Sequence, residues 1–398
     1  LFLFLLYLFG SFIALNGLWV QRVIIGWLAW ELTGSPAFVG LAAFLSLAPT
    51  IISGPIFGVI IDRTNIRIAF FLSYSGMMIC SILLFSLIKT ELLNNNSLLV
   101  ICLFIGFIAS AAHPIRMSLA PRLVDDIHLP SMVILTAVNF NTSRLIGPAV
   151  GGILIQTFDV SGAILCSIFS FIPVMLFITI IKPRNIEIDR NSKTLISSFI
   201  EGIKLILSNK IIKIAIILSG ITSFIGRGIL ETLPLISEGV FQKGPSGLGL
   251  ITATAGAGAL FSSITKALGK SEVVGTNIPV KSFLIALMIP LIVLTLGYVN
   301  EFKITLFLIF ILGFLVTTIG ISIQSKIQLE LSDTFRGRVM SVWVMINMGS
   351  AALGTIIFGF VSDYLTIQMT QVVFGYIFII LIVFLISINK MTSGSSIV

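Results

Sequence analysis

The chain has 398 residues, of which 57% are hydrophobic and only 10% are charged. Because a soluble globular domain carries roughly 25% charged residues, this composition excludes an ordinary cytosolic enzyme. A membrane-spanning helix needs about 20 mostly apolar residues, so the chain is long enough for a dozen spans but leaves no room for a sizeable soluble domain. The net charge of +8 is compatible with nucleic-acid binding or with Lys and Arg held in cytoplasmic loops.

Apolar runs bounded by charged residues, Pro or Gly recur along the whole chain and predict twelve membrane-spanning helices. We therefore expect an all-α membrane protein. The predicted spans cover residues 1–30, 36–61, 66–88, 98–115, 130–157, 160–181, 211–237, 246–268, 280–299, 303–325, 337–362 and 367–388.

The positions of the basic residues predict the orientation of these spans. With the first loop placed outside, 18 of the 24 Lys and Arg residues fall in inside loops or the tail, and only three fall in outside loops. Such a bias is typical of cytoplasmic loops, so both termini are predicted to be cytoplasmic. It also removes the nucleic-acid interpretation, and no nucleic-acid partner is expected.

A polar segment at 182–210, with an amphipathic stretch over 194–207, divides the chain. We expect two pseudo-symmetric six-helix halves, 1–181 and 211–398, joined by this cytoplasmic linker. A weak internal repeat supports duplication, an architecture in which transporters place their site between the repeats. A few identities in two apolar halves can also arise by chance. At an offset of 208, Asp125, Met132, Asn139 and Gly151 match Asp333, Met340, Asn347 and Gly359; at 209, Pro36, Gly40 and Leu41 match Pro245, Gly249 and Leu250.

Two motifs suggest a family. The run Gly-Val-Ile-Ile-Asp-Arg-Thr-Asn-Ile-Arg over 58–67 resembles the loop signature GxLaDRxGRK of the major facilitator superfamily, although Asn65 and Ile66 replace the second glycine and one base. The run Gly-Pro-Ala-Val-Gly-Gly over 147–152 resembles the GPxxGG motif of the drug:proton antiporters of that superfamily, with Ser143 where a glycine is usual. Both matches are partial.

Three further stretches make the resemblance more specific. They are Gln21-Arg22 followed by Leu-Thr-Gly-Ser-Pro over 32–36, Pro-Arg-Leu-Val over 121–124 leading to Asn139 and Arg144, and Gln328 leading to Arg-Gly-Arg-Val-Met-Ser over 336–341. Together they resemble the transmembrane secretion-effector branch, which includes the enterobactin exporter, macrolide efflux proteins and a lysophospholipid transporter. The resemblance covers essentially the whole chain and implies the major facilitator fold, but it does not identify the substrate.

The resemblance also implies roles for particular residues. The loop motif would hold the cytoplasmic side closed, with Asp62 pairing with a base or a helix end. In the alternative, these charges only anchor helix ends and enforce topology. The small residues of the second motif permit close helix contact, and its proline would let the helix bend. The implied gating set is Asp62, Arg63, Arg67, Arg336 and Arg338, and the helix-bending motif is Gly147, Pro148, Gly151 and Gly152.

Four ionisable residues lie deep inside predicted spans: Arg22, Arg144, Arg227 and Glu231. Each costs at least about 2.5–3.5 kcal/mol at mid-bilayer, so each is expected to face a cavity or a partner. Glu231 is the candidate for proton coupling, because burial favours a carboxyl group that loads and unloads a proton. The alternative is a static ion pair, either with Arg227 one turn away or with Arg22, which occupies the corresponding position of the repeat.

The surplus of arginine predicts an anionic substrate, since guanidinium groups suit carboxylates and phosphates. For Arg144 the alternative is that it braces the helix around Gly147 and Pro148 through backbone carbonyl groups. The candidate substrate-binding residues are Arg22, Asn16, Trp19, Asn139, Asn141, Arg144, Arg227 and Asn347.

These observations predict a transporter and no enzyme. We expect a proton-coupled secondary active exporter, working by alternating access, for a small anionic or amphipathic organic molecule, with a siderophore favoured. Multidrug or macrolide efflux, a lysophospholipid flippase and a non-transporting sensor of the same fold are alternatives. The expected partners are the substrate, protons and membrane lipid, with no cofactor and no metal, in a monomer. The expected location is the bacterial cytoplasmic (inner) membrane, crossed many times.

Overall fold

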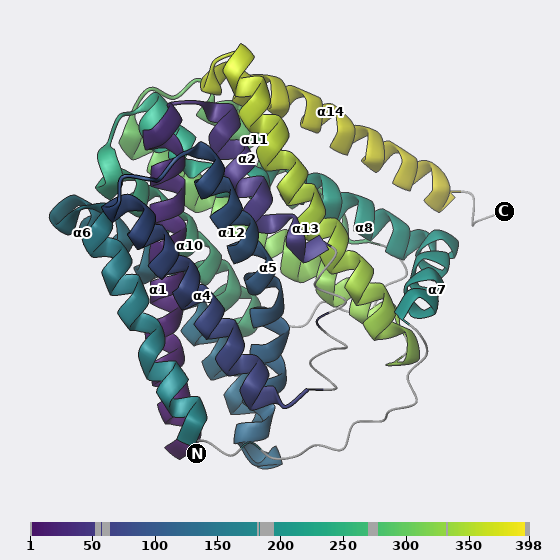
Figure 1. The fold of residues 1–398 in the computed structure, drawn as a ribbon. Helices are drawn as coiled ribbons and strands as arrows, with labels where there is room; N and C mark the ends of the chain where they lie inside the picture. Colours follow the sequence, from purple (N-terminus) through teal and green to yellow (C-terminus); the bar gives the residue numbers. More distant parts are fainter. Residues whose placement is uncertain are drawn as a thin grey trace.

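The computed structural model describes residues 2–51, 57, 64–180, 183, 195–269, 278–331 and 333–394. Within these ranges every regular element is a helix, and no strand occurs (Figure 1). Nine of the described helices are long and apolar enough to cross a membrane, and two shorter apolar helices accompany them. The prediction of an all-helical, membrane-spanning protein is confirmed.

The helices form two consecutive groups, separated by α7 (Leu195–Ser208). The first group contains α1 (Phe2–Thr33), α2 (Pro36–Leu47), α4 (Ile66–Lys89), α5 (Asn95–Leu119), η1 (Ala120–Leu123), η2 (Asp126–His128) and α6 (Leu129–Ile180). The second contains α8 (Lys210–Thr222), η3 (Ser223–Arg227), α9 (Gly228–Glu231), η4 (Leu235–Val240), α10 (Gly244–Leu268), α11 (Val280–Leu296), α12 (Phe302–Glu330), α13 (Asp333–Tyr364) and α14 (Ile367–Gly394).

The longest helix, α6, is interrupted at Phe158 and Asp159. Both residues have non-helical dihedral angles, and Asp159 has a φ of 58°, in the left-handed region that side chains rarely adopt. An unbroken helix of 52 residues would extend about 78 Å, more than twice the hydrocarbon thickness of a bilayer. The break therefore separates the predicted spans 130–157 and 160–181. The total of twelve spans stays a prediction, because the second span, 36–61, runs beyond the described residues.

Short connections make successive helices antiparallel, so the bundle has two ends. We call the end that carries the start of α1 the N-terminal face; it lies at the bottom of Figure 1. The other end, the opposite face, carries the turns between α1 and α2 and between α13 and α14, at the top of Figure 1. The sequence predicts that the N-terminal face is cytoplasmic.

Local sequence explains how the chain turns at the opposite face. Gly34 ends α1 with a φ of 59°, which costs glycine little because it has no Cβ. Ser35 then caps α2 by accepting a hydrogen bond from the backbone N–H of Phe38 at 3.3 Å, and Pro36 occupies the first turn of the new helix. The Ser35 hydroxyl also donates to the carboxylate of Asp363 on α13 at 2.9 Å. This cap therefore also links the two halves at the opposite face.

Two pairs of glycines bring the halves into backbone contact. Where α2 crosses α13, a Cβ on Gly40 would lie 3.0 Å from the Cα of Gly359. Where α6 crosses α10, a Cβ on Gly152 would lie 2.8 Å from the Cα of Gly249. Real Cβ atoms do not approach so closely, so these crossings need glycine. Gly40 and Gly249 lie near the starts of their helices, and both crossings are therefore closer to the opposite face.

The two crossings are related by the predicted repeat. Gly40 and Gly249 are partners at its offset of 209. The residue that corresponds to Gly359 at the other crossing is Gly152, one position after the Gly151 that the repeat predicts. Gly151 instead faces α1, where its Cβ would lie 3.2 Å from the Cα of Val20. Neighbouring glycines of the motif thus serve two different helix contacts.

We expect Gly152→Ala to lower the stability of the protein by about 1–3 kcal/mol, because an added methyl group at the α6–α10 crossing forces the backbones apart. Gly320→Ala on α12 is the matched control, since a Cβ there meets no atom within 4 Å. The measurement is the thermal unfolding midpoint of each purified variant in detergent. Equal unfolding midpoints for the two variants would contradict the claim that the close α6–α10 crossing stabilises the protein.

Candidate functional site

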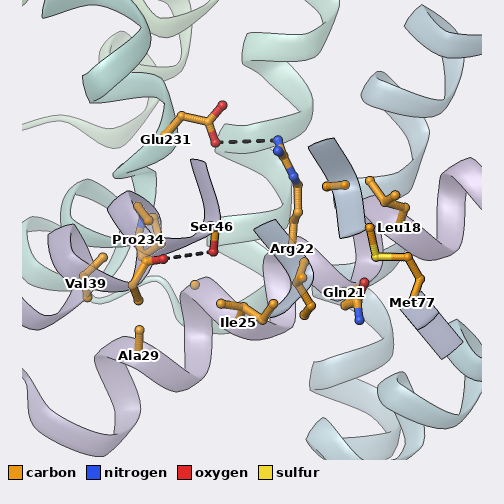
Figure 2. A pocket seen from close by; sticks show the side chains of 15 residues that line it. Leu18, Gln21, Arg22, Ile25, Ala29, Val39, Ser46, Met77, Glu231 and Pro234 are labelled. Atoms are coloured by element: carbon orange, nitrogen blue, oxygen red, sulfur yellow. Dashed lines mark hydrogen bonds and ion pairs between the residues drawn. The ribbon is translucent and has the colours of Figure 1, made fainter. Parts of the chain in front are cut away.

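An ion pair joins the two halves at the centre of the bundle. Nη1 of Arg22 on α1 lies 3.6 Å from Oε2 of Glu231 at the end of α9 (Figure 2). The two side chains are 36% and 23% exposed, so both retain access to the interior cavity. Of the two partners that the sequence left open for Glu231, Arg22 is the one that forms the ion pair.

Two π-helical turns flank the segment that carries Arg227 and Glu231. The turn η3 ends at Arg227, α9 follows, and the turn η4 begins four residues after Glu231. A π-turn widens the helix by one residue and so rotates the side chains that follow it; such turns are frequent at functional sites. Neither turn lies between Arg227 and Glu231, so the turns set how this stretch faces α1, and it is Arg22 of α1 that comes within ion-pair distance of Glu231.

A buried polar network fixes Arg227 on the side away from the cavity. Its Nη1 donates to Oδ1 of Asn347 at 3.5 Å, and the same oxygen accepts a hydrogen bond from Ser223 at 2.7 Å. Asn347 and Trp343, both on α13, donate to the hydroxyl of Ser219 at 2.8 and 3.1 Å. Asn347 is only 7% exposed. It therefore supports Arg227 from within the protein and does not line the cavity.

The ring of Trp19 contacts two guanidinium groups. The Cζ atoms of Arg22 and Arg144 are 5.0 and 6.0 Å from its centroid, within the range of cation–π contacts. Gly147 makes room for this ring, since a Cβ there would lie 2.5 Å from the Cβ of Trp19. Arg144 forms no hydrogen bond or ion pair with any residue of the described ranges. The expectation that it braces backbone carbonyl groups is therefore not met there.

Three guanidinium groups thus surround one carboxylate in the same cavity. Arg22, Arg144 and Arg227 line it together with Trp19 and Glu231. A single carboxylate leaves the cluster with surplus positive charge in a region of low dielectric constant, where an unpaired charge is costly. An anionic group of a ligand entering this cavity would offset that cost.

The ion pair separates two small cavities of about 90 Å³ each. Both are lined by Arg22, Gly26, Glu231 and Pro234. The second cavity holds the three arginines, whereas the rest of the first is uncharged (Figure 2). Pockets for drug-sized molecules usually measure about 300–1,000 Å³, so neither is sufficient alone. Opening the pair would join them into one cavity with an anion-binding end and an apolar end.

Besides Asn347, three of the predicted substrate-binding residues do not line either cavity. The amide of Asn16 donates to the carbonyl of Phe12 at 2.8 Å and to Ser143 at 3.2 Å. Asn139 donates to the carbonyl of Leu8 at 3.0 Å, and Asn141 donates to its own helix. Asn16 and Asn139 thus join α1 to α6, which positions the helices that carry Trp19 and Arg144.

The described members of the predicted gating set make contacts at the N-terminal face. Nε and Nη2 of Arg67 donate to the carbonyl oxygens of Ile178 and Thr179, at 3.2 and 2.5 Å. These carbonyl groups end α6, so Arg67 closes a helix terminus within its own half. Asp62 and Arg63 lie outside the described residues.

The second-half members of that set, at the start of α13, contact the linker and the end of α12. Arg338 forms an ion pair with Glu201 of α7, and a Cβ on Gly202 would lie 2.9 Å from the carbonyl oxygen of Arg338. Nη2 of Arg336 lies 3.5 Å from the carbonyl oxygen of Leu331. The contacts of Arg338 dock the amphipathic linker helix on α13, whereas Arg336 bonds to the end of α12. The gating role of the set stays a prediction.

Sequence analysis did not identify much of the first cavity's wall. Pro234, Ser46 and Met77 line it. Pro234 had a usable signal, because a proline inside the apolar run 211–237 interrupts a helix at bilayer depth. Ser46 and Met77 had none, since polar and flexible side chains of this kind also pack in the interior of helix bundles.

The comparison with known families identifies this architecture. The sequence model of the transmembrane secretion effector family matches residues 3–396. The chain belongs to this family. As a transmembrane secretion effector it is a transporter of the major facilitator kind, not an enzyme, and the predicted family is confirmed.

One curated relative is the staphyloferrin A transporter of Staphylococcus aureus (strain NCTC 8325 / PS 47). It is 22% identical over 394 residues, which cover 92% of this chain and 91% of the relative. The likeness extends over both halves, so no large domain separates the two proteins within the aligned region.

Solved transporter structures share the fold over nearly the whole chain. The nucleoside transporter NupG has a TM-score of 0.76 at 14% identity, covering 97% of this chain and 99% of the other. An inward-facing, unoccupied bacterial homologue of the human lysosomal transporter Spinster has a TM-score of 0.69 at 12% identity, covering 96% and 95%. At these identities the likeness establishes the fold alone.

We expect Asn347→Ala to destabilise the protein by about 1–3 kcal/mol, because Ser219, Ser223 and Arg227 lose a buried partner. Asn141→Ala is the matched control, since its amide bonds only to the carbonyl of Ala137, and it should cost less than about 0.5 kcal/mol. Unfolding of the detergent-solubilised variants by a stronger denaturing detergent measures both. A loss that is equal in the two variants would argue against the network.

Proposed function

We propose that this transmembrane secretion effector is a proton-coupled secondary exporter of a small organic anion with an apolar portion, and that its substrate is a carboxylate siderophore. The observation that carries the proposal is the central cluster, in which three guanidinium groups share one carboxylate. The proposed site consists of Arg22, Trp19, Arg144 and Arg227, with Asn347 positioning Arg227.

Charge is the main argument for an anion. Arg144 contacts the face of Trp19 and forms no hydrogen bond or ion pair within the described chain, so its N–H groups are free for an incoming acceptor. A guanidinium group binds a carboxylate through two parallel hydrogen bonds, which are among the stronger ones in proteins. A cationic drug would instead meet net repulsion in this cavity.

The siderophore assignment rests on the relative. That protein is named for staphyloferrin A, and the likeness covers nearly the full length of both chains. Because identity is only 22%, staphyloferrin A itself enters as the first compound to test. The uncharged wall of the first cavity suits the portion of such a molecule that carries no charge.

The ion pair between Arg22 and Glu231 suggests how substrate and proton are linked. A substrate carboxylate that binds Arg22 displaces Glu231, which stays ionised beside Arg227 on the outward step. After the substrate leaves on the external side, Glu231 takes a proton there, carries it to the cytoplasm on the return step, gives it up and pairs with Arg22 again. Proton and substrate would thus move in opposite directions through a single site.

We place the protein in the bacterial inner membrane with both termini in the cytoplasm, on the strength of the basic residues in the predicted inside loops. The glycine crossings and the bond between Ser35 and Asp363 hold the halves together at the opposite face, which is then the external one. Loading would occur from the cytoplasm and release would require these contacts to part.

Glu231→Gln should abolish transport driven by a proton gradient, while exchange of substrate across the membrane continues, because an amide occupies the site but carries no titratable proton. The measurement is uptake into inside-out vesicles with and without an imposed pH gradient. Glu301→Gln is the control for loss of an exposed carboxylate. Unimpaired uphill transport by Glu231→Gln would remove Glu231 from the coupling role.

Arg144→Gln should raise the KM for staphyloferrin A in these vesicles about ten- to hundredfold, which corresponds to the loss of about 1.5–3 kcal/mol from a charged hydrogen bond. Arg144→Lys should retain part of the affinity, because it keeps the charge but not the planar fork. Asn141→Ala, on the same helix but outside the cavities, should match the wild type.

A deletion strain distinguishes the substrate classes. Under iron limitation it should secrete less iron-chelating activity than its parent, and complementation should restore secretion. Unchanged chelator together with greater susceptibility to a macrolide would indicate drug efflux, and the proposal of an anionic siderophore would be withdrawn.

A further inference from the structure

Arg116 is a further arginine of the first half that the central site does not use. It lies in the last turn of α5, toward the N-terminal face. Its Cζ is 5.0 Å from the ring centroid of Phe140 on α6, and the Tyr74 hydroxyl lies within hydrogen-bonding reach of its guanidinium group, which carries five N–H donors. No carboxylate among the residues that the structure describes forms an ion pair with it.

The rings beside Arg116 connect it to the central cluster. The Phe140 and Trp19 centroids are 6.2 Å apart with the planes at 58°, and Trp19 in turn contacts both Arg22 and Arg144. Arg144 follows Phe140 by one turn, about 6 Å along α6. A continuous row of arginines and aromatic rings therefore leads from the end of α5 to the ion pair at the centre. We call Arg116, Phe140 and Trp19 the arginine–aromatic row.

Orientation in the membrane explains a positive charge at this end of α5, but not this arrangement. Arg122 of η1 already supplies a cation there, and its Nη2 lies 3.4 Å from the hydroxyl of Ser118. Arg116 differs because its guanidinium group is held on an aromatic face that leads inward. A cation–π contact orients the group while leaving its N–H edges available to an anion.

We propose that Arg116 and Phe140 form a staging site, at which a carboxylate of the transported anion binds before it moves to Arg144 and Arg22. This site rests on the proposed function, since it takes the same substrate. A carboxylate that arrives from the N-terminal face meets the Arg116 fork first. Transfer along one turn of α6 then brings it to Arg144, which pairs with no acidic group of the described ranges. The staging site raises the rate of association without adding to the final contacts.

Stopped-flow fluorescence of Trp19 tests this directly. Phe replacements of Trp27, Trp30 and Trp343 leave Trp19 as the single reporter, and citrate, a soluble tricarboxylate, is the probe. We expect Arg116→Gln to lower the association rate constant about tenfold and to weaken its dependence on salt, because steering is lost. The dissociation rate constant should change less than about twofold, since the final site is intact.

Three variants separate staging from a general effect of charge or folding. Arg116→Lys keeps the charge and should retain most of the association rate. Arg122→Gln removes a cation from the same end of the helix but outside the arginine–aromatic row, and should associate like the wild type. Phe140→Leu keeps Arg116 charged but removes the ring that orients it, so it should slow association and provides a second test if Arg116→Gln does not fold.

An unchanged association rate in Arg116→Gln, or in Phe140→Leu if the former does not fold, overturns the proposal. So does an equal slowing in Arg122→Gln, or an affinity loss that resides in dissociation alone. Failure of the proposed function has a different signature: citrate would then leave Trp19 fluorescence unchanged in the protein with all its arginines intact. If citrate quenches Trp19 fluorescence and Arg144→Gln abolishes this quenching, but Arg116→Gln associates at the wild-type rate, the proposed function stands and the staging site is ruled out.

Discussion

The cost of placing charge in a low-dielectric interior governs the centre of this protein. A chain with so few charged residues nevertheless keeps four of them at bilayer depth, and each must find a partner or a cavity. Arg22 and Glu231 satisfy one another across the two halves, and Arg227 is held by Asn347. Arg144 is left with the face of an aromatic ring. The central cluster therefore has an excess of positive charge, which an anionic ligand would stabilise. This excess is the physical basis of the proposed function.

Close helix packing provides the rigid bodies that can carry such a site. In a bilayer no hydrophobic force drives helices together, so contact depends on small residues that let backbones approach. Glycine pairs supply this contact at the two crossings between the halves, Gly40 with Gly359 and Gly152 with Gly249. They are concentrated toward the opposite face. The α6–α10 contact continues from there to the centre, where a Cβ on Gly256 would lie 2.5 Å from the carbonyl oxygen of Arg144, so opening the opposite face requires these glycine contacts to part together.

The central ion pair and the arginine–aromatic row have complementary properties. The pair divides the interior into two cavities that are each too small for a drug-sized ligand, so binding must rearrange it. The row approaches the same point from the N-terminal face, through rings that hold arginine without neutralising it. The arginines beside these rings thus attract the anion along its whole entry path. Competition between the substrate carboxylate and Glu231 for a guanidinium group occurs only at Arg22. This separation lets the rate of loading and the coupling of fluxes depend on different residues.

Hydropathy along the chain was sufficient to predict the helical membrane class, and motifs were sufficient to predict the family, because each is set by local sequence. The offset repeat even placed Arg22 and Glu231 at corresponding positions. Tertiary structure alone decided which charges meet, since each residue turns about 100° around a helix and the π-turns beside α9 shift that rotation. Rotation about the helix axis therefore separated Arg144 from Asn141, assigned Gly151 and Gly152 to different neighbours, and gave Glu231 to Arg22 in preference to Arg227. Sequence determined where these side chains stand along their helices, and only packing determined the direction in which they point.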